Sequence, residues 1–188
     1  MKRLLIMTVG KTHSGKSTFA GLLEKELENS IVMDQDNHAE FINTYYRKLQ
    51  PKQGPNTLKH DISHLIVEYA KKQTDSHLII CNSNRYQKGR EYLLKNLFPP
   101  AEFFRIIVHF DIPDQVLQTR VSLSERSTKI FRSASTFEEV LKRQQAEMVT
   151  DPAIGEADHL FVIRDGTEVD SVIREIVRIS QKPEGGTA

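Results

Sequence analysis

The chain has 188 residues, enough for one domain that buries its own core. Its formal charge is +1, with 26 basic and 25 acidic residues and no block of like charge, so bulk charge does not favour nonspecific binding to nucleic acid. No apolar run reaches the roughly 20 residues of a membrane-spanning helix, and the single cysteine excludes an intrachain disulfide. We therefore expect a cytoplasmic protein that does not enter membranes.

The first third of the chain alternates between apolar and amphipathic segments. A mostly apolar run at 3–9 predicts a buried strand, and apolar side chains on one face of 17–28 predict a helix. A short strand is predicted at 31–33 and a helix over 38–49. Two prolines and a glycine in 50–55 then interrupt the regular structure.

The middle of the chain continues the alternation. Asp61 is predicted to cap a helix with an apolar stripe, and a third strand is predicted at 77–81. A helix over 88–97 stops before two consecutive prolines. A fourth strand is predicted at 104–110, followed by a helix over 113–123 with a proline in its first turn.

The last third begins with a polar and basic segment, 124–134, that shows no clear period. Thr136 and Glu139 form a capping box, which predicts the start of another helix. A fifth strand is predicted at 159–163, and the apolar stripe of 169–177 predicts the last helix.

This order of elements predicts an α/β fold. Five strands alternating with helices indicate a three-layer sandwich, in which a five-stranded parallel sheet lies between helices. Residues 1–181 are predicted to form one domain with a lid at about 124–136, and the polar residues 182–188 a disordered tail.

The segment between the first strand and the first helix matches a phosphate-binding loop. Gly10, Gly15, Lys16 and Ser17 satisfy the pattern G-x-x-x-x-G-K-[ST], in the strand–loop–helix context that the motif requires. Glycines let several amide groups face one point, where the helix N-terminus adds partial positive charge. The alternative, a glycine-rich turn that binds nothing, would leave this match unexplained.

The loop predicts how a nucleotide would be held. Lys16 can reach the outer phosphates as a point charge, and the Ser17 hydroxyl can ligate Mg²⁺. Neither Lys11 nor the His13 side chain receives an individual role, and the choice between ATP and GTP stays open. The loop residues predicted to surround the nucleotide are Gly10, His13, Ser14, Gly15, Lys16, Ser17 and Thr18.

Two aspartates follow the second strand, where open α/β sheets carry their sites. Asp34 and Asp36 are one residue apart, so in an extended segment they point the same way. Phosphoryl transfer to a hydroxyl needs a carboxylate that accepts the proton, and Mg²⁺ needs oxygen ligands. One aspartate can act as the base while the other supports the metal or the acceptor; the alternative is a solvated turn.

Polar residues also follow the third strand. Asn82, Asn84 and Arg85 are candidate contacts to an acceptor or a phosphate, and the alternative is a turn rich in Asn and Ser. Cys81 is interpreted as a buried thiol, because nothing near it in sequence would activate it as a nucleophile.

A loose basic series crosses the polar segment before the capping box. Arg120 and Arg126 are candidate catalytic residues, because arginines on a closing lid can neutralise the charge of a transferred phosphoryl group. Lys129 and Arg132 belong to the same series, and a solvated basic helix end is the alternative.

The residues after the fifth strand are a weaker candidate. The segment 164–166, Arg-Asp-Gly, either borders the adenine or is a turn before the last helix. The seven histidines show no metal-ligand spacing.

Taken together, these motifs resemble the small P-loop kinases related to zeta toxins and to the kinase domain of polynucleotide kinases. The resemblance implies the fold of P-loop-containing nucleoside triphosphate hydrolases. The resemblance spans roughly residues 3–180 and implies that Lys16 binds the β- and γ-phosphates. It also implies that Asp36 is the base toward the acceptor hydroxyl, with Asp34 in a secondary role.

The chain departs from that family at two places. Polynucleotide kinases carry an arginine shortly after the base, whereas the first arginine after Asp36 is Arg47. Many relatives have an acidic residue at the end of the third strand, where Cys81 and Asn82 stand. Both departures concern the acceptor more than the donor.

The favoured function is therefore an ATP- and Mg²⁺-dependent kinase for a hydroxyl of a small molecule, sugar or nucleotide. A 5′-hydroxyl polynucleotide kinase is a less favoured alternative, because it needs a basic acceptor channel. A regulatory ATPase is a third, for which Asp111 is the candidate acidic residue at a strand end. A monomer and a homodimer are both compatible with the sequence.

Overall fold

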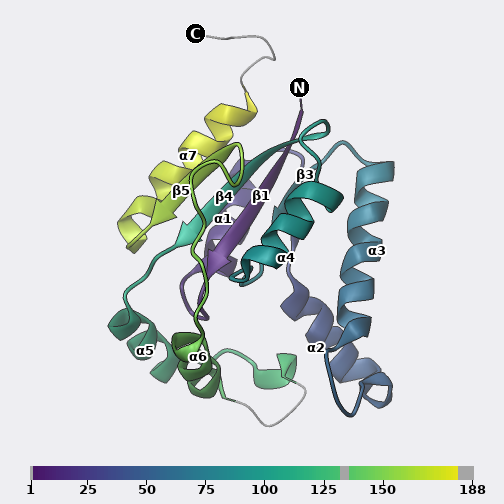
Figure 1. Cartoon of the computed structure of the whole chain (residues 1–188), viewed down its shortest axis with the longest axis vertical. Helices are drawn as coiled ribbons and strands as arrows, with labels where there is room; N and C mark the ends of the chain where they lie inside the picture. Colours follow the sequence, from purple (N-terminus) through teal and green to yellow (C-terminus); the bar gives the residue numbers. More distant parts are fainter. Residues whose placement is uncertain (1, 132–135, 182–188) are drawn as a thin grey trace.

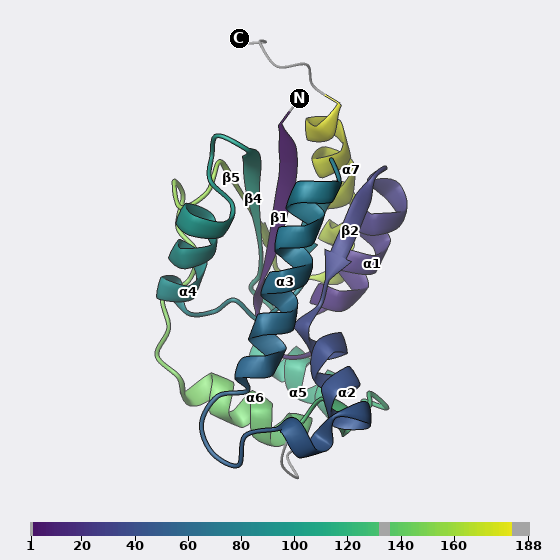
Figure 2. The same ribbon diagram turned by 90° about the vertical axis from the view of Figure 1, so that its right-hand side faces the viewer.

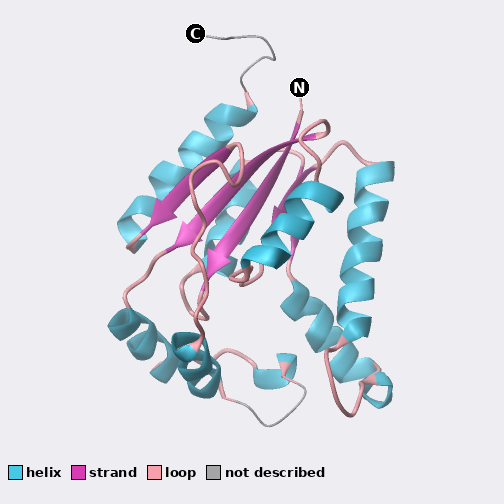
Figure 3. Cartoon of the chain, viewed as in Figure 1, coloured by secondary structure: helices cyan, strands magenta, loops and turns pink. Residues whose placement is uncertain are grey.

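The computed structural model describes residues 2–131 and 136–181. All five predicted strands are present and pair in parallel, in the order β2-β3-β1-β4-β5 (Figure 3). Their bounds are Arg3–Gly10 for β1, Ser30–Met33 for β2, His77–Ile80 for β3, Phe103–Phe110 for β4 and His159–Ile163 for β5. The parallel five-stranded α/β fold predicted from the sequence is confirmed.

Helices cover both faces of the sheet (Figure 2). On one face α1 and α7 pack against β1 and β4; on the other lie α3 and α4. The α-helices are α1 (Lys16–Glu26), α2 (Gln35–Tyr45), α3 (Thr57–Gln73), α4 (Gln87–Tyr92), α5 (Asp114–Ser122), α6 (Phe137–Ala146) and α7 (Val169–Ser180). Single turns of other helix types occur at Arg47–Leu49, Leu93–Leu97, Thr128–Ile130 and Gly166–Glu168.

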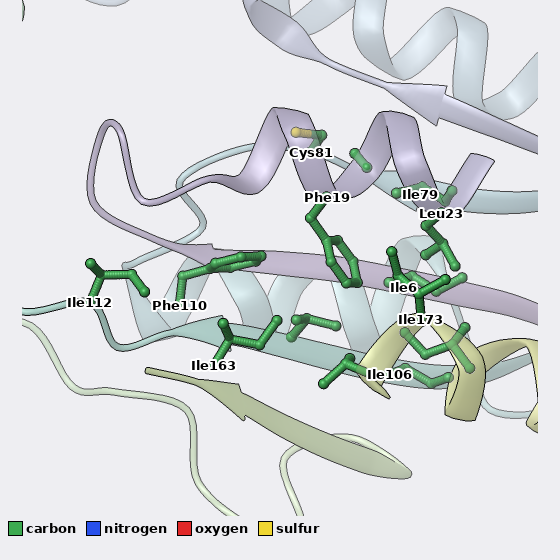
Figure 4. Close-up of a cluster of buried hydrophobic side chains, with 14 of the residues drawn as sticks. Ile6, Phe19, Leu23, Ile79, Cys81, Ile106, Phe110, Ile112, Ile163 and Ile173 are labelled. Carbon is green, nitrogen blue, oxygen red and sulfur yellow. The ribbon is translucent and has the colours of Figure 1, made fainter. Parts of the chain in front are cut away.

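The strand pattern explains the two cores. Side chains alternate across a strand, so Leu4 and Ile6 of β1 join the core under α1 and α7, whereas Leu5 and Met7 join the core under α3 and α4. All four are almost fully buried, as expected for a central parallel strand. Figure 4 shows the first core, in which Phe19 of α1 packs edge-on against Phe110 of β4.

Two predicted helix starts differ from the structure. Helix α3 begins at Thr57 and is capped by Asn56, whose side chain accepts a hydrogen bond from the Lys59 amide; Asp61 lies inside the helix, so its prediction as the cap is wrong. Helix α2 begins at Gln35, three residues earlier than predicted, because Asp34 caps it. Asp36 therefore lies in a helical turn, and the predicted extended Asp34–Asp36 segment is wrong.

The later elements match their predictions more closely. The capping box of Thr136 and Glu139 forms as expected at the start of α6. The predicted lid at 124–136 includes the turn Thr128–Ile130 and also residues 132–135, which lie outside the described residues, as does the predicted tail 182–188. Among the helices that the structure describes, none is long and apolar enough to span a membrane.

A buried arginine joins α4 to the loop before β5. Arg90 has no exposed surface, and its guanidinium forms a bidentate pair with Glu156 at 2.6 and 3.2 Å. It also donates to the backbone carbonyls of Asn84, Arg85 and Thr150. Each polar atom is thus satisfied without water, the condition under which a buried charge is tolerated.

We expect Arg90→Met to destabilise the fold strongly. The substitution leaves the Glu156 carboxylate without its cation, which costs about 3–5 kcal/mol of unfolding free energy in comparable buried pairs. Urea denaturation followed by circular dichroism measures the loss. The control is Lys95→Met, which breaks an exposed pair with Glu91 and should change the unfolding free energy by less than about 1 kcal/mol. Equal effects of the two substitutions would contradict a structural role for Arg90.

Candidate active site

The main cleft of the molecule lies at the carboxyl ends of the strands. In Figure 1 the strand arrowheads point toward the region where α2, α5 and α6 gather. The cleft has a volume of about 830 Å³ and is lined by the loop between β1 and α1, by the starts of α2 and α3, and by residues of α5 and α6. Chain segments far apart in sequence therefore meet around the predicted phosphate loop.

Two glycines give the loop its shape. Gly10 has φ of 155° and Gly15, which precedes α1, has φ of 102°. A Cβ on Gly10 would lie 2.9 Å from Ser14 Oγ and 3.0 Å from Phe110 Cβ, which is closer than a side chain tolerates. The motif glycines are thus required by backbone conformation and by close approach.

Lys16 is held inside the loop. Its ammonium donates to the Lys11 carbonyl oxygen at 2.5 Å and to Ser14 Oγ at 3.2 Å. Desolvation by burial lowers the pKa of Lys16 to about 8, against the opposing influence of nearby Cys81 and Asp36. An anion in the loop would stabilise the charged ammonium and raise this pKa again.

Oxygen ligands suited to Mg²⁺ lie beside the loop. Ser17 Oγ donates to Asp34 Oδ2 at 3.3 Å, which joins the start of α1 to the cap of α2. Burial raises the pKa of Asp34, and the hydrogen bond from the Asp36 amide acts in the opposite direction. In proteins Mg²⁺ takes one or two carboxylates and completes its shell with phosphates and water. The Ser17 and Asp34 oxygens fit such a site, although no group of three or more His, Cys, Asp or Glu ligands occurs within residues 2–131 and 136–181.

Cys81 lies next to this pair without being reactive. Its Sγ is 3.7 Å from Ser17 Oγ, and burial raises the pKa of the thiol to about 11. The thiol therefore stays protonated near neutral pH, in agreement with the interpretation of Cys81 as a buried side chain.

Asp36 is paired with an arginine from the segment after α5. Arg126 Nη2 lies 2.9 Å from Asp36 Oδ2, and the guanidinium lies over the ring of Phe137 at 5.5 Å from its centroid. The two predicted catalytic residues thus meet across the cleft. Their pairing connects α2 with the segment after α5, which contacts the start of α6 through the ring of Phe137.

The second arginine lies at the phosphate loop. Arg120 Nη1 donates to the His13 carbonyl oxygen at 3.2 Å and is 4.0 Å from the Cβ position of Gly15. Arg120 lies in the last turn of α5 and forms no ion pair with a carboxylate among the described residues, so its charge is directed at the loop. Among the predicted catalytic residues Lys16, Asp36, Arg120 and Arg126, every one lines the same cleft.

His13 connects the loop with the segment after α5. Its Nε2 lies 2.7 Å from Ser124 Oγ, and its ring packs edge-on against Phe137 at 4.7 Å. Desolvation lowers the pKa of His13, helped by the positive charge of Arg126, so the ring is neutral at physiological pH. His13 thus helps to position the loop, a role that the sequence did not suggest.

The residues after β3 divide into two groups. Asn82 lines the cleft, and its Oδ1 accepts a hydrogen bond from the Gln35 amide at 3.1 Å, which orients the start of α2.

Asn84 has φ of 44° and donates to the Thr8 carbonyl oxygen at 2.9 Å. Arg85 is 6% exposed and pairs with Glu147 at 2.8 Å. Neither Asn84 nor Arg85 lines the main cleft, so we correct their prediction as acceptor contacts: both satisfy polar groups of the protein.

Sequence reasoning missed several residues of the cleft. Gln144 Oε1 accepts a hydrogen bond from the Thr12 amide at 2.7 Å, and Phe137 packs against both His13 and Phe131. The capping box predicted where α6 begins, and hence that Phe137 and Gln144 lie two turns apart. It carried no information about which end of the sheet α6 contacts. Lys59 was also missed, because nothing in the sequence indicates which end of the sheet the start of α3 contacts.

The turn after β5 also reaches the cleft. Asp165 and Gly166 are among its lining residues, whereas Arg164 pairs with Asp111 at 3.6 Å on the exposed surface. Asp165 caps the short turn that follows by accepting from the Thr167 amide. A contact between the segment 164–166 and the adenine therefore stays a prediction. The segment also has a structural role, because Asp165 caps the turn.

No protein-family model matches the chain, and no curated protein matches it closely enough to be counted. Solved structures with the same fold do match. A Chloroflexus aurantiacus protein proposed to be a kinase has a TM-score of 0.66 at 17% identity, over 95% of this chain and 98% of that one.

Two further structures match over almost their whole length. The APS kinase of Mycobacterium tuberculosis, in complex with AMPPNP and APS, has a TM-score of 0.56 at 16% identity, over 96% of this chain and 99% of that one. A fungal RNA kinase has a TM-score of 0.57 at 11% identity, over 98% and 92%. At such identities the likeness shows that this chain has the fold of P-loop kinases.

The lowered pKa of Lys16 predicts pH-dependent binding of a non-hydrolysable ATP analogue. If the loop binds phosphates through the charged ammonium of Lys16, affinity is full below pH 8 and falls as pH rises through the pKa of about 8. Binding near pH 8 should therefore take up a proton. Calorimetry in two buffers of different ionisation enthalpy measures that uptake.

Two variants control this experiment. Lys16→Met should weaken binding and abolish the proton uptake, whereas Lys25→Met, at the exposed end of α1, should change neither. If the wild-type protein binds the analogue near pH 8 without taking up a proton, Lys16 is already fully charged and the lowered pKa is wrong.

Proposed function

We propose that this chain is a kinase that transfers the γ-phosphoryl group of ATP to a hydroxyl of a small molecule, sugar or nucleotide, with Mg²⁺. One observation carries the proposal: the Asp36 carboxylate lies in the same cleft as Lys16 and the phosphate loop. A phosphate loop alone serves any nucleotide-binding protein. A carboxylate facing it supplies the group that an alcohol acceptor needs.

The donor side is assigned to the loop. The amides of the loop and the N-terminus of α1 hold the phosphates, and Lys16 binds the outer ones. Ser17 and Asp34 would hold Mg²⁺, which supplies charge neutralisation on the phosphate oxygens when it is bound. Arg120, directed at the loop from α5, adds positive charge where the transferred group would lie.

The acceptor side is assigned to Asp36. The acceptor hydroxyl oxygen forms a bond to the γ-phosphorus while the bond from that phosphorus to the β–γ bridging oxygen breaks, and ADP leaves. The hydroxyl proton passes to the Asp36 carboxylate. In the structure Arg126 forms an ion pair with this carboxylate. Catalysis therefore requires Arg126 to leave Asp36 and to bind the phosphoryl oxygens instead. The segment between α5 and α6 would then act as a lid.

The regulatory ATPase considered from the sequence has less support. Its candidate acidic residue, Asp111, is exposed, pairs with Arg164 and does not line the main cleft. ATP turnover that is insensitive to every added acceptor would favour this alternative over the kinase.

We expect Asp36→Asn to separate transfer from nucleotide binding. Loss of a general base lowers the rate by about 10²–10⁴-fold, whereas affinity for a non-hydrolysable ATP analogue should change little, because the loop is intact. A screen of hydroxyl-bearing metabolites for ADP formation identifies an acceptor for this measurement. The control is Asp75→Asn, an exposed carboxylate outside the cleft. Transfer that survives Asp36→Asn would remove the assignment.

A second candidate function, phosphorylation of a 5′-hydroxyl end of a single-stranded nucleic acid, is favoured by the surface around the α2–α3 connection. The segment 41–60 contains no acidic residue, but it carries Arg47, Lys48, Lys52 and Lys59. Its rings at Phe41, Tyr45 and Tyr46 are 45%, 71% and 48% exposed. Exposed aromatics beside cations form the usual platform for single-stranded nucleic acids. The local charge is thus more basic than the net charge of the chain.

This second candidate predicts labelling of 5′-hydroxyl oligonucleotides from γ-labelled ATP. The labelling should weaken steeply with added salt, because phosphate contacts release counterions. Tyr45→Ala with Arg47→Ala should lower it at least about tenfold, while Leu65→Ala, an exposed apolar residue of α3, should not. An absence of labelled ends in the wild-type reaction would exclude this function.

A further inference from the structure

One lysine of the cleft has no part in the donor chemistry. Lys59 lies in the first turn of α3, is half-buried, and lines the cleft together with Gln35 and Asp36 of α2. The phosphate loop already has Lys16, Arg120 and Arg126 within the same cleft. Lys59 comes from a different side, the helix pair α2–α3 that also presents Asp36.

Hydrogen bonds hold the Lys59 turn in place. The Lys59 amide donates to the Asn56 side chain at 3.3 Å, and the Lys59 carbonyl oxygen accepts from Ser63 Oγ at 2.8 Å. Ser63 Oγ is in turn 2.8 Å from Nδ1 of His38, which lies two residues after Asp36. The turn that carries Lys59 is therefore tied to the helix that carries Asp36.

The ammonium of Lys59 has no carboxylate partner at ion-pair distance within the described residues. Asp61, the nearest aspartate in sequence, forms no ion pair with Lys59 in the described part of the chain. The aspartates at the start of α2 are engaged elsewhere: Asp36 with Arg126 and Asp34 with Ser17. A half-buried cation loses part of its hydration, and an anion in the cleft would compensate for that loss. Lys59 belongs to the segment 41–60, which contains no acidic residue and whose other cations add to the positive potential.

We propose that Lys59 binds an acidic substituent of the acceptor, a phosphate above all, while the hydroxyl to be phosphorylated faces Asp36. This inference rests on the proposed kinase function, and it narrows the acceptor to phosphate-bearing alcohols. Such a phosphate comes either from a small molecule, as in a sugar phosphate or a nucleotide, or from the backbone of a nucleic acid. Neutral sugars would leave the Lys59 ammonium uncompensated.

The first test measures binding and needs no activity. The protein is saturated with Mg²⁺ and a non-hydrolysable ATP analogue, so the phosphate loop is occupied, and inorganic phosphate is titrated into the complex by calorimetry. Lys59→Met should weaken phosphate binding at least about tenfold, the usual effect of one charge-assisted hydrogen bond. Lys59→Arg should keep most of the affinity, because it keeps the charge.

The matched control is Lys72→Met, on the last turn of the same helix, where Lys72 pairs with Glu68 outside the cleft. Phosphate binding should be unchanged in this variant. Equal affinity of the wild-type protein and Lys59→Met, equal loss in both Met variants, or no phosphate binding by the loaded wild-type protein would each overturn the inference.

The second test compares acceptors. With a phosphate-bearing alcohol, Lys59→Met should raise KM at least about tenfold and change kcat little, because Lys59 binds the acceptor and does not touch the reacting atoms. Sugar phosphates and single-stranded oligonucleotides form separate arms that identify the source of the phosphate. A preference for neutral alcohols as acceptors would overturn the inference about Lys59, but it would not contradict the proposed kinase function. Absence of transfer to any acceptor, with phosphate binding retained, would instead count against the kinase.

Discussion

The sharp turn from β1 into α1 is the constraint on which the site depends. Gly10 and Gly15 adopt backbone conformations that other residues avoid, and Gly10 lies so close to Ser14 and Phe110 that a side chain would not fit. This turn points the N-terminus of α1 into the cleft and places Lys16 among carbonyl and hydroxyl oxygens. Elements far away in sequence then contact the loop through single polar bonds, such as that from Thr12 to Gln144.

The charges of the cleft are balanced by groups of the protein itself. Arg126 is held by Asp36, and Lys16 is desolvated, which lowers its pKa. Arrival of a polyphosphate would compete for both cations, because its charge exceeds that of one carboxylate. The proposed transfer therefore couples two events: the phosphate loop gains its anion, and Asp36 is released to meet an acceptor hydroxyl.

The success of sequence reasoning varied between elements for physical reasons. The strands were predictable because a central parallel strand is buried on both faces and must be apolar, as in 104–110. The starts of α2 and α3 were less predictable, because several polar residues could serve as caps and packing chose Asp34 and Asn56. The sequence predicts Arg85 as a binding residue, and that prediction is wrong because the burial of Arg85 against Glu147 and the Gln144 carbonyl is a long-range event.

The sequence by itself determined the α/β architecture and the phosphate loop with Lys16 and Ser17. Both follow from local rules, namely the burial of apolar runs and the backbone freedom of glycine. The tertiary structure alone decided which side chains face that loop. It paired Arg126 with Asp36 and brought Lys59 to the same cleft. It also assigned Asn84 and Arg85 to the protein scaffold. These outcomes depend on how α2, α3 and α6 pack at the ends of the strands, and such long-range contacts leave no pattern in a single sequence.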